Sequence, residues 1–189
     1  MDRQISAIIL AGGLSSRMGT NKAELLLDGK RFLEIQIEKC RQLGIQDILL
    51  SGYSGRLPGT RSIPDVIAHC GPMSGLHACL ESVQNPAALV LAIDTPLVPV
   101  SALFTLLEAH TSGITMLSCS GKAEPLIAVY DIQLCDRLAK KLEEGHCSLM
   151  RLASEIGFQT VAYTGDPALL MNCNTPEEYW SLCTNGKTH

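Results

Sequence analysis

The stretch from residue 7 to residue 22 constrains the fold of this chain more than any other part of the sequence. It opens with an uninterrupted apolar run, residues 7–11, and a run this short and this apolar is typical of a strand buried inside a parallel sheet. Two glycines and two cations follow it: Gly12, Gly13, Arg17 and Lys22. Glycines let backbone N–H groups close on a bound group, and cations attract negative charge. The segment therefore predicts a phosphate-binding loop at the C-terminal end of a parallel strand.

Two better-known phosphate loops are excluded by the spacing of these residues. The P-loop places its lysine directly after a glycine and before Ser or Thr, whereas Lys22 lies three residues after Gly19 and precedes Ala23. The Rossmann fingerprint requires G-x-G-x-x-G, but here Gly12 and Gly13 are adjacent and the next glycine is distant. The loop therefore belongs to another type of phosphate site.

The rest of the chain alternates between short apolar runs and amphipathic segments. The predicted strands cover residues 7–11, 47–50, 62–65 at an edge, 88–93, 114–119, 126–130 and 158–163. The predicted helices cover residues 32–43, 71–83, 100–110, 131–144 and 148–156, with a last helix from Pro176. Residues 54–62 and 120–125 are predicted loops. We therefore expect an α/β fold, a three-layer α/β/α sandwich with a mostly parallel, Rossmann-like sheet, formed by a single domain over residues 1–189.

Composition limits the class of protein further. Hydrophobic residues make up 46% of the 189 residues and charged residues 18%, which indicates a globular chain with its own core. Aromatic residues are only 4%, so we expect the aliphatic core that covers a parallel sheet. No apolar run reaches the length of a membrane span, and residues 1–4 leave no room for a signal peptide. We expect a cytoplasmic protein without membrane contacts.

The net charge of −4 argues against nucleic acid as a partner, because no basic stripe is present to displace counterions. It leaves a nucleotide substrate open, since a local pocket of cations can bind phosphate on an acidic protein.

The eight cysteines are spread along the chain without a C-x-x-C pair. Without a secretory signal we expect free, buried thiols. A zinc cluster of His69, Cys70, His77 and Cys79 is disfavoured, because the glycines and proline between them fit a turn into a helix better.

Two further segments carry oxygen ligands for a metal. Asp94 follows the most hydrophobic predicted strand, residues 88–93, and so lies where ligands bind in open α/β sheets. A carboxylate there suits Mg²⁺, which bridges phosphate oxygens; the alternative is an aspartate that only caps a loop. The amide of Asn174 would complete the Mg²⁺ shell or orient a phosphate. The run from Asn172 to Pro176 is equally an ordinary helix start, and the sequence leaves both interpretations open.

Together these motifs resemble the signature of nucleotidyltransferases that activate a sugar, alcohol or phosphate with a nucleoside triphosphate. The match comprises Leu10-Ala11-Gly12-Gly13, Ser16-Arg17-Met18-Gly19, Lys22, Asp94-Thr95-Pro96 and Asn172-Cys173-Asn174-Thr175-Pro176. Within that group the chain is similar to the molybdenum cofactor guanylyltransferase family. The matched motifs span residues 7 to 176, which is nearly the full chain.

The resemblance implies a reaction and a role for each matched residue. GTP and the terminal phosphate of molybdenum-bound molybdopterin would give the guanine dinucleotide cofactor and pyrophosphate. Mg²⁺ is the implied cofactor, and cofactor-insertion proteins or apo-molybdoenzymes are the implied protein partners. The implied catalytic residues are Arg17, Lys22 and Asp94. The implied nucleotide-binding residues are Leu10, Ala11, Gly12, Gly13, Lys22, Asp65 and Asp94, and the implied metal ligands are Asp94 and Asn174.

The choice of base is where the motifs disagree. Asp65, followed by the Gly-Pro-Met-Ser-Gly run at 71–75, resembles the family segment that reaches the nucleoside, the alternative being an exposed turn acid. Ser51 stands where a guanylyl enzyme often has an asparagine, and the residues 52–55 that follow look more like the cytidylyl branch. Glu124 replaces a histidine of the family, which puts the contact to the pterin in doubt. Three motifs resemble the guanylyl enzymes: Leu-Ala-Gly-Gly at 10–13, Gly-Pro-Met-Ser-Gly at 71–75 and Asn-Cys-Asn-Thr-Pro at 172–176. Only residues 52–55 favour cytosine, so we expect GTP over CTP.

Two alternatives stay open beside this hypothesis. One is a CTP-using molybdopterin cytidylyltransferase. The other is a catalytically silent nucleotide-binding module that escorts the cofactor to an apoenzyme. The intact Arg17, Lys22 and Asp94 favour an enzyme, because a pure binder has no need of a metal-centred set.

Overall fold

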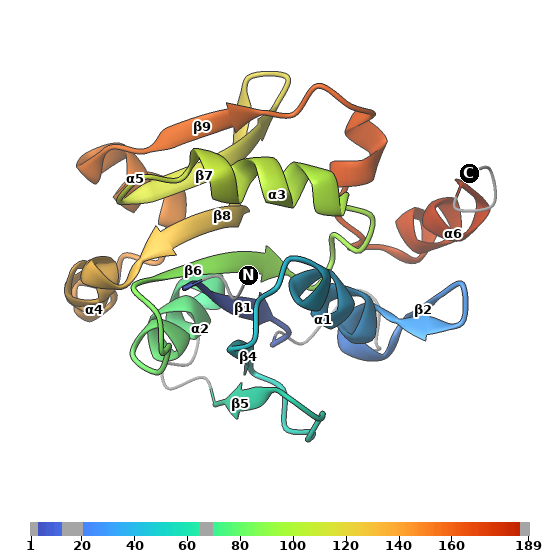
Figure 1. Ribbon diagram of the computed structural model, residues 1–189, viewed down its shortest axis with the longest axis horizontal. Helices are drawn as coiled ribbons and strands as arrows, with labels where there is room; N and C mark the ends of the chain where they lie inside the picture. The colour runs from blue at the N-terminus through green and yellow to red at the C-terminus, as the bar shows by residue number, and fades with distance from the viewer. Residues whose placement is uncertain (1–3, 13–20, 65–69, 186–189) are drawn as a thin grey trace.

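A seven-stranded sheet forms the centre of the computed structural model, which describes residues 4–12, 21–64 and 70–185 (Figure 1). The strand order is β5 (Arg61–Ile63), β4 (Ile48–Ser51), β1 (Ser6–Leu10), β6 (Ala87–Ala92), β8 (Lys122–Asp131), β7 (Ile114–Cys119) and β9 (Gln159–Ala162). The first four strands in this order pair in parallel, as do β7 and β9, whereas β8 is antiparallel to both of its neighbours. The predicted mostly parallel sheet is confirmed.

The two central strands, β1 and β6, are buried along their whole length. Side chains alternate between the two faces of a strand, so a strand whose apolar residues follow one another has to be covered on both sides. Each fully buried Leu or Ile contributes about 1.5–3 kcal/mol relative to an exposed one. The apolar runs that predict these strands are therefore also what places them at the centre of the sheet.

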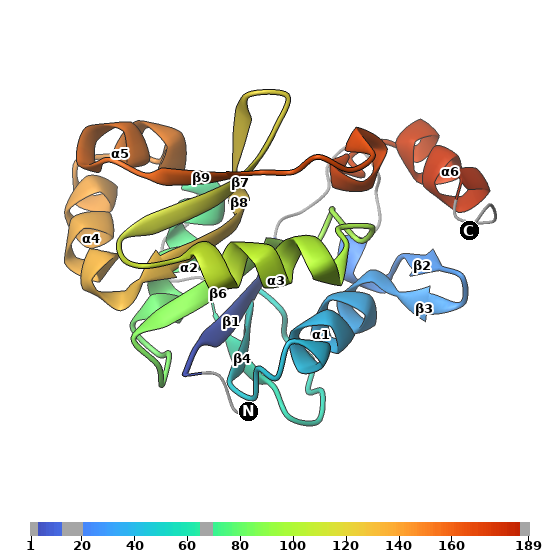
Figure 2. The same cartoon turned by 45° about the horizontal axis from the view of Figure 1, so that its top comes forward.

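Helices cover both faces of the sheet, as Figures 1 and 2 show. α1 (Phe32–Gln42) and α3 (Val100–Ala109) pack into one apolar core. α2 (Gly71–Leu80), α4 (Cys135–Glu143) and α5 (Leu149–Ile156) pack into a second core on the opposite face. This arrangement confirms the three-layer α/β/α sandwich. None of the helices among the described residues is long and apolar enough to cross a membrane.

A last helix, α6 (Pro176–Asn185), lies beside a small hairpin of β2 (Leu26–Leu27) and β3 (Lys30–Arg31) at one end of the molecule (Figure 2). The hydroxyl of Tyr179 on α6 donates a hydrogen bond to the Leu26 carbonyl at 2.7 Å, which ties the two elements together. Short 3₁₀ helices complete the described elements: η1 (Lys22–Glu24), η2 (Ile132–Leu134) and η3 (Pro167–Leu170).

Three segments differ from the predictions made from sequence. Residues 120–125 are not a loop: Ser120 and Gly121 have φ angles of 51° and 78°, which form a tight turn, and residues 122–125 already belong to β8 (Figure 2). The predicted helix 131–144 begins only at Cys135, because β8 continues to residue 131 and η2 follows it. The helix predicted over 71–83 ends at residue 80. In the first two cases pairing with a distant strand determined the structure, which local composition does not show. The third difference concerns only where a helix ends, a boundary that sequence defines poorly.

The prediction of free thiols is wrong for two of the eight cysteines. Cys70, the residue before α2, and Cys147, between α4 and α5, form a disulfide across 77 residues, with Cα atoms 5.0 Å apart. This proximity results from the packing of α2 against α4 and α5, which no sequence spacing encodes. Cys40 and Cys173 are buried thiols, as predicted, whereas Cys119, Cys135 and Cys183 are only partly buried.

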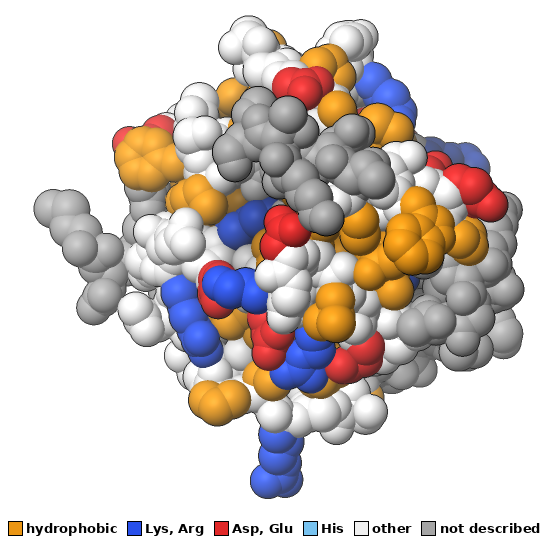
Figure 3. All heavy atoms as spheres, turned by 90° about the vertical axis from the view of Figure 1, so that its right-hand side faces the viewer, with side chains coloured by type: hydrophobic (Ala, Val, Ile, Leu, Met, Phe, Trp, Pro, Cys, Tyr) orange, Lys and Arg blue, Asp and Glu red, His pale blue; other side chains and the backbone are white. Residues whose placement is uncertain are grey.

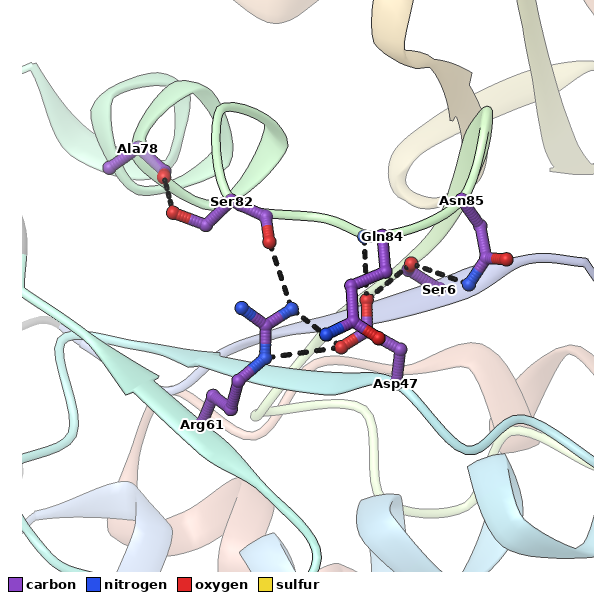
Figure 4. A network of polar contacts seen from close by, with 7 residues as sticks. All are labelled: Ser6, Asp47, Arg61, Ala78, Ser82, Gln84 and Asn85. Carbon is purple, nitrogen blue, oxygen red and sulfur yellow. Dashed lines mark hydrogen bonds and ion pairs between the residues drawn. The ribbon is translucent and has the colours of Figure 1, made fainter.

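The amino end of the sheet is closed by a network around Asp47 (Figure 4). Its carboxylate accepts hydrogen bonds from the hydroxyl of Ser6 at 2.6 Å, from the backbone N–H of Gln84 at 2.9 Å and from the guanidinium of Arg61 at 2.5 Å. Burial by itself would raise the pKa of Asp47, but these three donors outweigh it and hold the pKa below its usual value. The network links the starts of β1 and β4 to the residues before β6. The carboxyl ends of these three strands therefore lie on the opposite side of the sheet.

Candidate active site

The carboxyl ends of β1, β4 and β6 meet at one edge of the sheet. Leu10 is paired with Ser51 on one side and with Ala92 on the other. The pairing continues past the strand ends, where the N–H of Ala11 donates to the Ser51 carbonyl at 3.1 Å and that of Ile93 to the Leu10 carbonyl at 3.2 Å. On one side of β1 the sheet continues with β4 and β5, and on its other side it continues with β6. The strand order therefore reverses between β1 and β6. Such a reversal is where open α/β sheets bind ligands.

Three predicted site residues converge at this edge from distant parts of the chain. The ammonium of Lys22 lies 3.1 Å from a carboxylate oxygen of Asp94 and 2.5 Å from the side-chain carbonyl of Asn174. The Lys22 and Asp94 side chains are 14% and 19% exposed, so the group is largely enclosed but still open to solvent. A cation between a carboxylate and an amide oxygen, at the end of central strands, is suited to binding phosphates.

Local structure holds each of these residues in place. Lys22 begins η1, which the side chain of Asn21 caps by accepting the N–H of Ala23 at 3.1 Å. The backbone of Asp94 accepts the N–H of Cys173 at 2.7 Å, which brings Asn174 to the site.

The run before α6 performs two roles that the sequence left as alternatives. The hydroxyl of Thr175 accepts the N–H of Glu178 at 3.2 Å, and the Glu178 carboxylate accepts the N–H groups of Thr175 and Asn174, which is a capping box. The segment is thus an ordinary helix start. At the same time the side chain of Asn174 points to Lys22, so the helix start also presents an amide to the site.

The oxygen atoms of Asp94 and Asn174 fit a hard divalent cation. Both oxygen atoms already contact a positive charge, the ammonium of Lys22. Carboxylate and amide oxygens are also ligands that Mg²⁺ prefers. Burial raises the pKa of the neighbouring Cys173 thiol to about 11, and a thiol is a softer ligand than the oxygen atoms that Mg²⁺ prefers.

A second group of potential metal ligands lies elsewhere in the described residues. His77, Glu81 and Cys135 have ligand atoms within 4.8 Å of one another. Since α2 connects β5 to the parallel strand β6, it runs antiparallel to them, and its C-terminal end with Glu81 lies at the amino edge of the sheet. This group is therefore not the metal site of the phosphate-binding edge.

Of the remaining predicted site residues, some lie within the described structure and others lie outside it. Leu10 and Ala11 are buried at the end of β1, and Gly12 follows them at the same edge. Gly13, Arg17 and Asp65 lie outside the described residues, so the roles assigned to them stay predictions.

Two polar residues at this site were not singled out from the sequence. Gln36 and Lys39 are buried on α1 and donate hydrogen bonds to carbonyls next to Asp94. Gln36 falls on the same face as Leu33, Ile37 and Cys40, and a polar residue on an apolar helix face was the signal that could have drawn attention to it. Lys39 lies near the C-terminus of α1, an ordinary place for a cation, so its position in the sequence gave no such signal.

Figure 3 shows the side of the molecule toward which β6 points in Figure 1. On the coloured part of this surface, Lys and Arg side chains are interspersed with Asp and Glu. This differs from the continuous basic stripe by which proteins bind nucleic acid.

Fold and site together define a class. A glycine-ended central strand, with a lysine and a carboxylate at the switch point of a mostly parallel sheet, is the arrangement of a nucleotidyltransferase. Residues 7–159 match the family described as the MobA-like NTP transferase domain. The chain belongs to this family.

Individual relatives agree with this assignment. A molybdenum cofactor guanylyltransferase of Rhizobium meliloti is 32% identical over 191 residues, which cover 91% of this chain and 87% of the relative. The crystal structure of molybdopterin-guanine dinucleotide biosynthesis protein A from Archaeoglobus fulgidus has a TM-score of 0.78 at 20% identity, over 98% of this chain and 100% of that one. A Mycobacterium tuberculosis protein, Rv0371C, has been solved in complex with manganese, with a TM-score of 0.71 at 18% identity over 96% and 99% of the two chains.

Proposed function

We propose that this protein transfers GMP from GTP to molybdenum-bound molybdopterin, giving molybdopterin guanine dinucleotide and pyrophosphate. The observation that carries the proposal is the convergence of Lys22, Asp94 and Asn174 at the switch point of the sheet. The guanylyltransferase relative at 32% identity supports the choice of substrates.

The reaction needs little covalent chemistry from the protein. An oxygen of the terminal phosphate of molybdopterin forms a bond to the α-phosphorus of GTP. The bond from that phosphorus to the bridging α–β oxygen breaks, and pyrophosphate leaves with the electron pair. The attacking phosphate is already anionic, so no protein base is required, and catalysis consists of positioning and charge stabilisation.

Each site residue then has a defined task. Gly12 and Gly13 offer backbone amides to the triphosphate, and Arg17 and Lys22 stabilise its negative charge. Asp94 and Asn174 would hold Mg²⁺, which neutralises the charge on the phosphates when bound. When nucleotide binds, the ammonium of Lys22 is free to exchange its present oxygen partners for phosphate oxygens.

We assign the choice of nucleotide base to the residues at the carboxyl end of β1 and to Asp65. Backbone groups of Leu10, Ala11 and Gly12 would line the base, and the carboxylate of Asp65 would accept from the N1–H and exocyclic amine of guanine. Ser51 is paired with Leu10, so Ser51 and Gly52 lie beside these residues, and their small side chains would leave room for a purine.

Competition between equal concentrations of GTP and CTP tests the proposal directly. With molybdenum-bound molybdopterin present, we expect mainly the guanine dinucleotide, because a hydrogen-bonding pocket rejects the wrong base by about a thousandfold or more. Asp65→Ala should erode this preference more than it lowers the maximal rate. A product that carries mainly cytidine would favour the cytidylyltransferase alternative. Nucleotide binding without pyrophosphate release would favour the silent escort module.

Lys22→Ala should affect GTP binding and the chemical step together. The ammonium interacts with the triphosphate in the ground state and with the departing pyrophosphate, so we expect the KM for GTP to rise about tenfold and kcat to fall about a hundredfold. Steady-state kinetics with each substrate varied in turn makes the measurement. A change confined to the KM of the pterin substrate would place Lys22 on the other side of the site.

A further inference from the structure

Two buried side chains of α1 contact the turn that carries Asp94. Gln36 is fully buried, and its side-chain N–H₂ donates to the carbonyls of Ala92 at 2.8 Å and Thr95 at 3.1 Å. Lys39, which is 8% exposed, donates to the carbonyl of Pro96 at 2.5 Å. These carbonyls lie on both sides of Asp94 in the sequence. α1 therefore holds the backbone from which the carboxylate projects.

Neither side chain is a favourable choice for stability alone. Both contacts of Gln36 are carbonyls, so its amide nitrogen has to face them, and its buried side-chain oxygen is left without a partner in the described structure. A buried polar atom without a hydrogen bond destabilises the folded state. The partner of the Lys39 ammonium among the described residues is an uncharged carbonyl, and burial lowers its pKa to about 7. Apolar residues would fill the same space at lower cost.

The turn is also held from its other side. There the Asp94 carbonyl accepts the N–H of Cys173 at 2.7 Å, and within the turn the hydroxyl of Thr95 donates to the Ala92 carbonyl at 3.2 Å. Residues 92–96 are thus fixed between α1 and the segment before α6. Such restraint lowers the freedom that a metal ligand loses when it binds its ion.

We propose that Gln36 and Lys39 are positioning residues, which hold the turn at 94–96 so that the Asp94 carboxylate meets a divalent metal ion in one fixed place. The inference rests on the proposed function only in taking Asp94 as a metal ligand. It does not depend on which base or which acceptor is used.

Mn²⁺ titration followed by EPR tests this without turnover, on wild type, Gln36→Leu and Lys39→Met. Residues that orient a metal ligand typically change metal affinity by about ten- to a hundredfold, so we expect Mn²⁺ affinity to fall at least about tenfold in both variants. Turnover should recover in part at high Mg²⁺, because the lost positioning mainly weakens metal binding. The matched control is Leu33→Ala, which opens a cavity on the same helix and should lower the thermal midpoint with Mn²⁺ affinity unchanged.

Two outcomes overturn the inference. Unchanged Mn²⁺ affinity in Gln36→Leu and Lys39→Met would show that the turn needs no support from α1. Weakening that follows the thermal midpoint across all three variants, Leu33→Ala included, would show an effect of packing only. Failure of the proposed function looks different: wild type would bind Mn²⁺ and the two variants would bind it less well, yet none would transfer GMP.

Discussion

Replacing Asp94 by Asn is expected to reduce turnover more than about a hundredfold while the fold is kept. The amide retains the shape of the side chain but removes the negative charge that would hold Mg²⁺ on the phosphates. The loss should appear in kcat and as a higher Mg²⁺ requirement, measured by pyrophosphate release over a range of Mg²⁺ concentrations. Because Asn has nearly the same size as Asp and its side-chain oxygen can still accept from Lys22, the thermal midpoint should shift by only about a few degrees.

An exposed acid far from the site supplies the control. Asp136 lies on the surface of α4, and Asp136→Asn removes the same charge without touching the phosphate-binding edge. We expect it to keep wild-type turnover and Mg²⁺ dependence. If Asp94→Asn retained near-normal activity with an unchanged Mg²⁺ requirement, Asp94 would not be the metal ligand.

The second large effect is on stability, and it comes from Lys39. Burial lowers the pKa of this ammonium from 10.5 to about 7, with a small opposing effect of Cys40. Below pH 7 both folded and unfolded chains carry the proton, and the full cost of the buried charge applies. Between pH 7 and about 10 the unfolded chain binds a proton that the folded chain lacks, so stability rises with pH by about 1.4 kcal/mol per unit.

Lys39→Met should therefore be more stable than wild type at pH 6, by about 1–3 kcal/mol, even though it binds Mn²⁺ less well. The difference should shrink as the pH rises from 7 to 8.5, and chemical denaturation at each pH measures it. The range stops below pH 9 because burial also raises the pKa of the Cys40 thiol, which lowers stability once unfolded thiols ionise.

Lys140→Met, at an exposed lysine of α4, is the matched control and should show no such pH-dependent difference. A gap between Lys39→Met and wild type that stays constant from pH 6 to 8.5 would mean that Lys39 does not change protonation in this range.

Several features of the protein could be predicted because they depend on residues close together in the chain. The strands at 7–11 and 88–93 were identifiable because an apolar run of that length has to be buried on both faces. The Asp-Gly pair at 28–29 is a local turn signal of the same kind, because both residues tolerate positive φ, here 49° and 79°. The position of Asp94 at the carboxyl ends of the strands followed from its place directly after a central strand. The family signature itself is a local pattern of this kind.

Tertiary structure decided what depends on residues far apart in the sequence. The antiparallel direction of β8 depends on its pairing with β6 and β7, and the Lys-Ala-Glu-Pro run at 122–125 gives no local sign of it. The Cys70–Cys147 disulfide spans 77 residues and the Lys22–Asn174 contact spans 152. Gln36 and Lys39 lie 56 and 57 residues from the carbonyls of Ala92 and Pro96. Helix periodicity shows which face of α1 is buried, but only the folded chain determines that this face meets the turn of Asp94.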